Sequence, residues 1–247
     1  MRRPFYFAAW KSSKTMKEVE AFYYELSRRT LELTKNTEVV LAPAYVYFDV
    51  SRDKMPRPVQ LGAQDVCETD GSGRMGEISA TLLKEFGVKY CMVGNLEKRE
   101  RGESPQIVNR KILSLIKNEI VPILCVGENL SEYEGNRTKE VIAAQLSDEL
   151  LGVNNPNEMV ICYRPAWTTG TGYNATPDFV NTVAQHIRKT VVAMKDDARA
   201  GQFPIIYGGG VSKANVNDYM AQSDIDGVFI GASAVNIDEF CGVINGH

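Results

Sequence analysis

The sequence predicts an α/β protein folded as a closed (β/α)8 barrel. Its 247 residues, 44% hydrophobic and 24% charged, have globular composition and a length that one such barrel fills. Short apolar runs alternate with stretches of helical periodicity, as repeated βα units do. Most of the runs carry little polar alternation, which is typical of parallel strands buried on both faces. We therefore expect a single domain over residues 1–247, with a doubly wound open sheet as the structural alternative that periodicity alone does not exclude.

The expected strands are the apolar runs. In chain order they are Phe5–Trp10, Val39–Ala42, Val59–Gln64, Tyr90–Val93, Ile120–Val126, Met159–Tyr163, Pro204–Tyr207 and Val228–Ile230.

Helices are expected where apolar residues recur at helical spacing. They are Met16–Leu33, Ile78–Phe86, Val108–Ile116 and Thr138–Leu151, with a further helix opening at Thr176-Pro177-Asp178. That opening combines a capping hydroxyl, a first-turn proline and an early acid. Gly87 is a candidate C-terminal cap.

Charge and cysteine content exclude several classes of protein. The net charge of -3 gives no basic field for a polyanion, so we expect no nucleic-acid partner. The 5 cysteines lie far apart without a Cys-x-x-Cys pair, which indicates reduced thiols rather than a disulfide framework or a zinc site. No metal and no cofactor are expected. No apolar run approaches membrane-spanning length, and the start at Met1-Arg2-Arg3 shows no signal cleavage site, so we expect a cytoplasmic protein with no membrane partner.

Motifs spread along the whole chain carry a family resemblance. They are Trp10-Lys11, Gly62-Ala63-Gln64-Asp65-Val66, Val93-Gly94 with Glu97-Lys98-Arg99, Pro122-Ile123-Leu124-Cys125-Val126-Gly127-Glu128, the glycine-rich loop from Cys162 to Gly172, Tyr207-Gly208-Gly209, and Asp226-Gly227 with Gly231. In this order they resemble the triosephosphate isomerase family, whose fold is the TIM barrel. The resemblance implies the same fold here, while activity depends on the residues at the site.

The resemblance also implies that the family's two catalytic groups are replaced. Arg164 stands at the position of the glutamate base, and Asn95 at that of the histidine. A guanidinium offers five donors and no acceptor, so Arg164 cannot remove a carbon-bound proton. Asn95 can donate a hydrogen bond but cannot shuttle protons; alternatively it only satisfies backbone groups. Lys11, the family's cationic substrate contact, is retained, and Glu97 is the acid next to the site.

Two interpretations of Arg164 remain open. Lys11 and Arg164 would place two cations in one pocket, which is costly unless an anion neutralises them. Arg164 either binds a carboxylate or second phosphate of a ligand, or forms an internal pair with Glu97.

The phosphate-binding positions of the family act largely through backbone N–H groups. By resemblance they are Gly170, Gly210, Gly231 and Ala232. Gly210 replaces a serine and keeps the main-chain donor, whereas the methyl group of Ala232 replaces a glycine and would crowd a ligand. The alternative is that these glycines serve turn geometry alone.

The segment from Gly71 to Gly76 fits the pattern GxGxxG, but it does not directly follow its strand, so we expect no dinucleotide site. In the resembling family this stretch inserts into a partner subunit. Met75 occupies the tip of the loop, and we expect a homodimer through it.

Three functions fit these observations. We expect a catalytically silent or severely impaired homologue that binds a small phosphorylated or anionic metabolite. One alternative is an isomerase of a different sugar phosphate with a non-standard base such as Glu97. The other is a dimeric scaffold with an occluded site.

Overall fold

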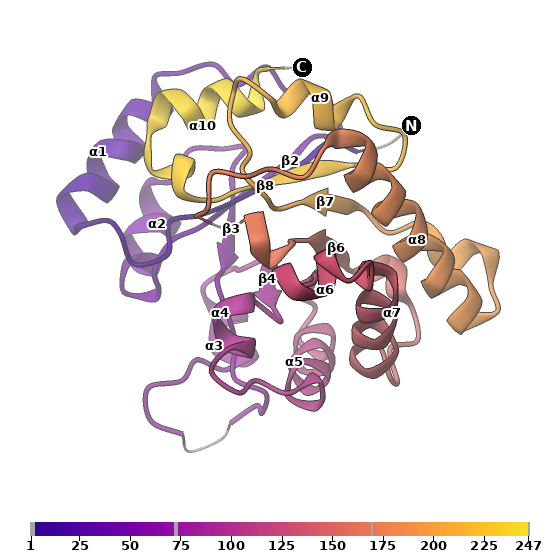
Figure 1. Ribbon diagram of the computed structural model, residues 1–247. Helices are drawn as coiled ribbons and strands as arrows, with labels where there is room; N and C mark the ends of the chain where they lie inside the picture. The colour runs from indigo at the N-terminus through magenta and orange to yellow at the C-terminus, as the bar shows by residue number, and fades with distance from the viewer. Residues whose placement is uncertain (1–2, 72–73, 169, 247) are drawn as a thin grey trace.

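The computed structural model describes residues 3–71, 74–168 and 170–246, and its strands close into a barrel (Figure 1). All neighbouring strands are parallel and follow one another in sequence order, and β1 pairs with β8. This closure confirms the (β/α)8 barrel. The doubly wound open sheet is wrong, because such a sheet would leave the first and last strands unpaired with each other.

The strands are β1 (Phe5–Ala9), β2 (Glu38–Ala42), β3 (Gln60–Ala63), β4 (Tyr90–Val93), β5 (Val121–Val126), β6 (Val160–Tyr163), β7 (Ile205–Tyr207) and β8 (Gly227–Ile230). Their ends lie within one residue of the ends of the expected apolar runs, because strands buried on both faces must be apolar almost throughout.

The α-helices form the layer outside the strands. They are α1 (Met16–Ser27), α2 (Phe48–Lys54), α3 (Ala80–Glu85), α4 (Leu96–Arg99), α5 (Pro105–Lys117), α6 (Leu130–Glu134), α7 (Thr138–Glu149), α8 (Pro177–Lys195), α9 (Val216–Met220) and α10 (Ile237–Ile244). Short 3-10 turns are η1 (Tyr45–Tyr47), η2 (Pro156–Glu158), η3 (Ala166–Thr168), η4 (Ala198–Gly201) and η5 (Ala232–Val235). Within the described ranges, no helix combines the length and the apolar character that crossing a membrane requires.

Local chemistry explains where several helices begin and end. The Thr176 hydroxyl accepts a hydrogen bond from the Phe179 N–H at the start of α8, with Pro177 in the first turn, as the sequence predicts. Gly87 follows α3 with a φ of 77°, a left-handed conformation that favours glycine and confirms the expected cap.

The first helix is shorter than expected. The predicted helix over residues 16–33 ends at Ser27. Beyond it, the Asn245 side chain donates to the Thr30 carbonyl (3.0 Å) and accepts from the Glu32 N–H (2.9 Å). These two backbone groups would serve a helix if it continued, so a contact from the far end of the chain overrides the local periodicity.

Successive side chains of each strand point alternately into the barrel and toward the helices. The interior is filled by Phe5, Phe7, Ala9, Val40, Ala42, Met92, Ile123, Cys125, Val160, Cys162, Ile206 and Phe229. Because aromatic and aliphatic side chains fill the interior, ligands have room only above it, at the carboxyl ends of the strands. The segment between β3 and α3, which carries Met75, extends away from the barrel (Figure 1).

Candidate functional site

Four of the predicted site residues meet at the carboxyl ends of three strands. Lys11 follows β1, Asn95 and Glu97 lie after β4 at the start of α4, and Arg164 follows β6. The Lys11 Nζ lies 2.7 Å from Glu97 Oε1, and the Arg164 Nη1 lies 3.3 Å from Glu97 Oε2. One carboxylate therefore pairs with both cations.

Lys11 is held in a strained conformation that presents its ammonium group. Its φ of 53° is in the left-handed region, which costs a non-glycine residue about 1–2 kcal/mol. The Gln64 side chain donates to the Lys11 carbonyl (2.9 Å) and to the Ala42 carbonyl (3.0 Å), which fixes this turn. The Lys11 side chain remains 52% exposed, so a ligand can reach it.

Arg164, in contrast, is almost fully enclosed, with a side chain only 4% exposed. Its Nη1 donates to Asn95 Oδ1 (2.6 Å) as well as to Glu97, and its Nη2 lies 3.5 Å from Glu97 Oε1. The guanidinium carbon lies 5.2 Å from the centre of the Phe229 ring. The structure thus contains the internal Arg164–Glu97 pair, one of the two interpretations of the sequence, and this pair occupies both Nη groups.

The side chain of Asn95 is committed to the same network. Asn95 precedes α4, and its backbone carbonyl accepts from the N–H groups of Lys98 (2.9 Å) and Arg99 (3.1 Å). Its side chain does not cap that helix but accepts from Arg164. The alternative that Asn95 merely satisfies backbone groups does not describe its side chain.

The electrostatics of the site keep Glu97 ionised. Partial burial by itself raises the pKa of Glu97, but the hydrogen bond from Lys11 and the charge of Arg164 outweigh burial and lower that pKa to about 2. Burial lowers the pKa of Arg164, and the nearby Cys125 and Glu97 reverse that effect and raise it. A carboxylate this acidic is a poor proton acceptor at neutral pH, and the guanidinium is none at all.

The loop after β6 is anchored at both ends. In η3, Trp167 Nε1 donates to the carboxylate of the buried Glu128 (2.9 Å). At the far end, the Ala175 N–H donates to the Tyr207 hydroxyl (3.3 Å), and the Tyr219 hydroxyl donates to the Ala175 carbonyl (2.8 Å). These hydrogen bonds fix the loop relative to β6, which Arg164 follows, and to β7.

The four predicted phosphate positions lie on the loops after β6, β7 and β8. Gly170 belongs to the first loop, Gly210 to the second, and Gly231 and Ala232 to the third. The second and third loops are joined by a hydrogen bond from the Ser233 hydroxyl to the Val211 carbonyl (3.2 Å). The structure therefore places these positions at the same mouth of the barrel as Lys11.

Space around these positions is uneven. A side chain built on Gly170 or Gly231 would meet nothing within 4 Å, so the space above both is open. At Gly210 the added carbon would lie 2.0 Å from Asn174 Oδ1, so the asparagine fills the space that a serine would take. Among the described residues, no protein group accepts a hydrogen bond from the backbone N–H of Gly210 or Gly231. Those two donors are open to an anion.

A cavity of about 650 Å³ adjoins the site. It reaches from Lys11, Asn95 and Glu97 to the segment after β3, where Asp65 and Glu77 line it. Lys11 and Glu97 thus face open space on one side, while Arg164 is not among its lining residues.

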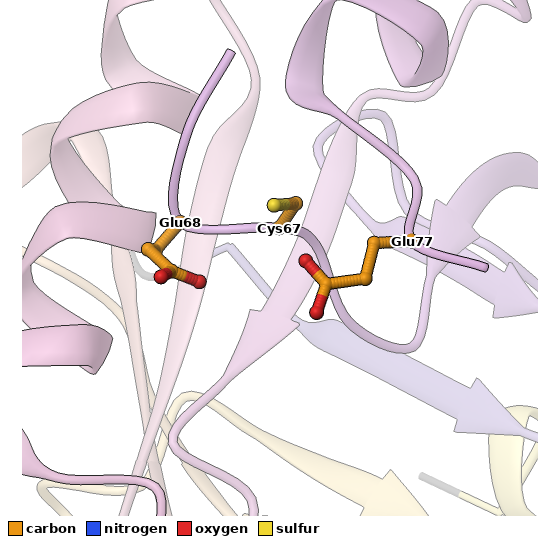
Figure 2. Close-up of side chains that lie close together, drawn as sticks. All are labelled: Cys67, Glu68 and Glu77. Carbon is orange, nitrogen blue, oxygen red and sulfur yellow. The ribbon is translucent and has the colours of Figure 1, made fainter. Parts of the chain in front are cut away.

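One group of potential metal ligands occurs in the described part of the chain. Cys67, Glu68 and Glu77 have ligand atoms within 4.8 Å of one another (Figure 2). The Arg74 guanidinium lies 2.7 Å from Glu68 Oε1 and 3.9 Å from Glu77 Oε2. It supplies the positive charge that these carboxylates need, so the cluster is explained as an ion-pair network.

The GxGxxG segment has no free helix end to offer a phosphate. Within it, Ser72 and Gly73 lie outside the described residues, as does Thr169 of the loop after β6. The following helix, α3, is capped by Ser79, and the Asp70 carboxylate accepts from the Thr81 N–H (3.2 Å). An acid thus occupies the place at the start of this helix that a phosphate would need.

Three contacts at the site were not predicted from the sequence. They are the hydrogen bond from the Gln64 side chain to the Lys11 carbonyl, the packing of the Asn174 side chain beside Gly210, and the position of Cys125 beneath Arg164. Gln64 and Cys125 both belong to motifs that carry the family resemblance, which was the available signal for them. Asn174 lies outside those motifs.

Comparison with known sequences gives the relatives of the chain. The family model described as triosephosphate isomerase matches residues 4–247. A protein named triosephosphate isomerase from Caldanaerobacter subterraneus subsp. tengcongensis is 37% identical over 251 residues, covering 99% of this chain and 100% of that protein. Proteins of the same name from Mycoplasmoides gallisepticum (34% over 243 residues, 96% of both chains) and Finegoldia magna (33% over 250 residues, 99% of both chains) are also similar. The similarity spans every strand that contributes to the site.

Proposed function

The chain belongs to the triosephosphate isomerase family, and on that premise we propose that it binds a small phosphorylated or anionic metabolite without isomerising triose phosphates at an appreciable rate. In this proposal the protein is catalytically silent or severely impaired. Its role is to bind a ligand.

One observation carries the proposal: the base position at the end of β6 holds a buried arginine in an internal ion pair. Both Nη groups of Arg164 are engaged by Asn95 and Glu97. Isomerisation of a sugar phosphate requires removal of a proton from carbon. A positioned acid or base contributes about 10²–10⁴-fold to such a step, and neither Arg164 nor Asn95 can act as one.

Anion binding is supported by the hydrogen-bond donors that a ligand can reach. Lys11 is half-exposed and bordered by the cavity. The backbone N–H groups of Gly210 and Gly231 point to no acceptor among the described residues, and Gly170 leaves open space above the loop. Backbone N–H groups and one ammonium suit a phosphate, because both donate hydrogen bonds to its negatively charged oxygens. We assign Ala232 to the rim of this site, by its position beside Gly231.

The two alternative functions have less support. A different isomerase with Glu97 as its base would need a carboxylate of moderate pKa, whereas the pKa of Glu97 is lowered to about 2. A scaffold with an occluded site would cover Lys11, whose side chain is 52% exposed.

The assembly and the setting of the protein are also proposals. We infer one domain over residues 1–247, a cytoplasmic location, and a homodimer formed through the segment after β3. At the tip of that segment Met75 is 99% exposed, and the apolar Val46, 76% exposed, lies after β2. Apolar side chains as exposed as these gain free energy when a partner covers them. No nucleic-acid partner, metal or cofactor is part of the proposal.

The binding half of the proposal can be tested with inorganic phosphate. Thermal unfolding is recorded with phosphate from zero to tens of millimolar at constant ionic strength. Ligand at 100 times Kd stabilises the folded state by about 2.7 kcal/mol, so the melting temperature should rise with concentration. A flat response would contradict the retained anion site.

The matched control is a pair of lysine variants. Lys11→Met should weaken phosphate binding about 10- to 100-fold, the loss expected for one charged hydrogen bond. Lys54→Met removes the same charge from an equally exposed lysine at the end of α2 and should leave binding unchanged. Equal effects of both variants would show that phosphate acts through general charge screening and not through this site.

A further inference from the structure

Two cysteines lie side by side inside the barrel, directly below the site. Cys125 on β5 and Cys162 on β6 are register partners on neighbouring parallel strands. Both belong to the set of side chains that fills the interior. Neighbouring strands are about 4.7–4.9 Å apart, which falls within the Cα–Cα range of about 4.4–6.8 Å found for disulfides. The register therefore places the two thiols where a disulfide can form.

The other three cysteines are placed differently. Cys91 and Cys241 face the layer between strands and helices, and Cys67 follows β3 in the segment that leaves the barrel. All five are reduced thiols in the structure.

The surroundings of the pair distinguish its two members. Cys162 is the register partner of Cys125, and a carbon added at Gly208 would lie 2.9 Å from Cys162 Sγ, so the glycine leaves room for this sulfur. Above the pair, Arg164 has a buried Nε with no hydrogen-bond partner among the described residues. A sulfur that carries negative charge beneath this group would complement it.

We propose that Cys125 and Cys162 form an oxidation site, at which hydrogen peroxide converts the two thiols into a disulfide linking β5 to β6 beneath Arg164. In the first step the Cys125 thiolate attacks the peroxide, whose O–O bond breaks: Cys125 gains an S–OH group and hydroxide leaves. In the second step the Cys162 sulfur attacks Cys125, the S–O bond breaks, the disulfide forms, and the Cys162 proton and the leaving hydroxide make water. The peroxide is the oxidant and is reduced; both sulfurs are oxidised.

The roles of the two sulfurs follow from their environments. The hydrogen bond from Cys162, together with the charges of Arg164 and Arg99, lowers the pKa of Cys125 although burial opposes this. Burial raises the pKa of Cys162 well above the usual range, so it stays protonated until the second step. Cys125 is therefore the attacking sulfur and Cys162 the resolving one.

Access selects the oxidant. Cys125 is 3% exposed, so a water-sized hydroperoxide can enter when the Arg164 side chain shifts, while a bulky disulfide reagent cannot. We expect hydrogen peroxide to form the bond and glutathione disulfide to leave both thiols free over the same time.

The experiment uses the full-length, fully reduced protein. After treatment with hydrogen peroxide, thiols are counted under denaturing conditions and the disulfide is located by non-reducing peptide mapping. We expect two of the five thiols to be lost, with Cys125 linked to Cys162. Peroxide-treated protein that keeps five thiols, or that forms a link or stable oxidised sulfur elsewhere instead, would overturn the proposal.

Three variants test the order of the steps, each first checked for native circular dichroism. Cys162→Ser removes the resolving thiol but keeps a hydroxyl donor beside Cys125, so a cyclic 1,3-diketone should trap a sulfenic acid at Cys125. Cys125→Ala should abolish both the trapped product and the link. Cys91→Ala, a buried cysteine outside the barrel interior, should form the link as the parent does. Peroxide labelling of Cys162→Ser that spares Cys125 would contradict the assignment, and if a variant fails to fold, the mapping of the parent protein decides.

Discussion

Replacing Glu97 by glutamine isolates the feature on which the site depends, namely one carboxylate that neutralises two cations. Glu97 contacts Lys11 at 2.7 Å and Arg164 at 3.3 Å. Lys11 loses little from the change, because its ammonium group is half in water. Arg164 is 4% exposed and would keep its charge without a counter-charge from a carboxylate. We therefore expect Glu97→Gln to destabilise the fold while strengthening the attraction of the site for anions.

The size of the effect follows from burial. Removing one partner of a buried ion pair costs about 3–5 kcal/mol. Here Glu97 is 38% exposed, and the new amide oxygen can still accept from Arg164, so water and the retained hydrogen bond reduce the loss to about 2 kcal/mol. For a chain of this length that corresponds to a fall of about 4–8 °C in melting temperature.

Urea unfolding and thermal scans measure this change, and pH gives an independent check. The pKa of Glu97 is about 2 in the folded protein, below the value of about 4.3 expected for the unfolded chain. A depressed pKa stabilises the fold above the unfolded pKa, and this contribution is lost as the pH falls through the folded pKa. The stability difference between parent and Glu97→Gln should therefore be full above about pH 5 and shrink toward pH 2.

The control is Glu119→Gln, which removes a carboxylate from an exposed pair with Lys84 and should barely change the unfolding curve. A Glu97→Gln variant that unfolded like the parent and bound phosphate no more tightly would show that Glu97 does not neutralise the two cations.

Three further predictions concern catalysis, the anion site and assembly. The double variant Asn95→His with Arg164→Glu should give weak isomerisation at most, measured as kcat/KM. The new carboxylate would lie beside that of Glu97, and a catalytic group needs positioning within about 0.5 Å. Rates typical of active isomerases from this double variant alone would contradict the prediction. Gly210→Ser should lower the melting temperature and weaken phosphate binding, since its new carbon would lie 2.0 Å from Asn174 Oδ1. Adding Asn174→Gly should restore both properties. If Gly210→Ser changed neither, the Asn174 side chain would move aside freely. Met75→Glu should shift the sedimentation coefficient from dimer toward monomer, and an unchanged value would place the interface elsewhere.

The barrel was predictable because each strand is buried on both faces and therefore reads as an uninterrupted apolar run. Closure is a different kind of fact. It depends on β1 meeting β8, residues more than two hundred positions apart in the chain, and periodicity within a run carries no information about it. The family resemblance supplied that step. The predicted end of α1 was wrong for the same reason. Asn245, from the other end of the sequence, binds the backbone just beyond the observed end of the helix.

At the site, the sequence identified the residues but not their partners. The sequence did not decide whether the Arg164 guanidinium binds a ligand or pairs with Glu97. That choice depends on the geometry of side chains that follow different strands. For Cys125 and Cys162 the sequence predicted only reduced thiols, with no indication that the two lie together. A shift of one residue in register would turn a side chain from the barrel interior to the helix layer. The proximity of the two cysteines therefore becomes known only from the observed register of β5 and β6.

An isomerisation assay measures directly whether the site is catalytically silent. Dihydroxyacetone phosphate in deuterated buffer is followed by proton magnetic resonance for aldose formation and for exchange at carbon. The protein is made in a host that lacks its own triosephosphate isomerase, with a named relative purified in parallel. We expect neither product nor enzyme-dependent exchange, because Arg164 cannot accept a proton and Glu97 is too acidic to do so. Turnover within about a hundredfold of the relative would contradict the account, since losing both catalytic groups should cost more than that.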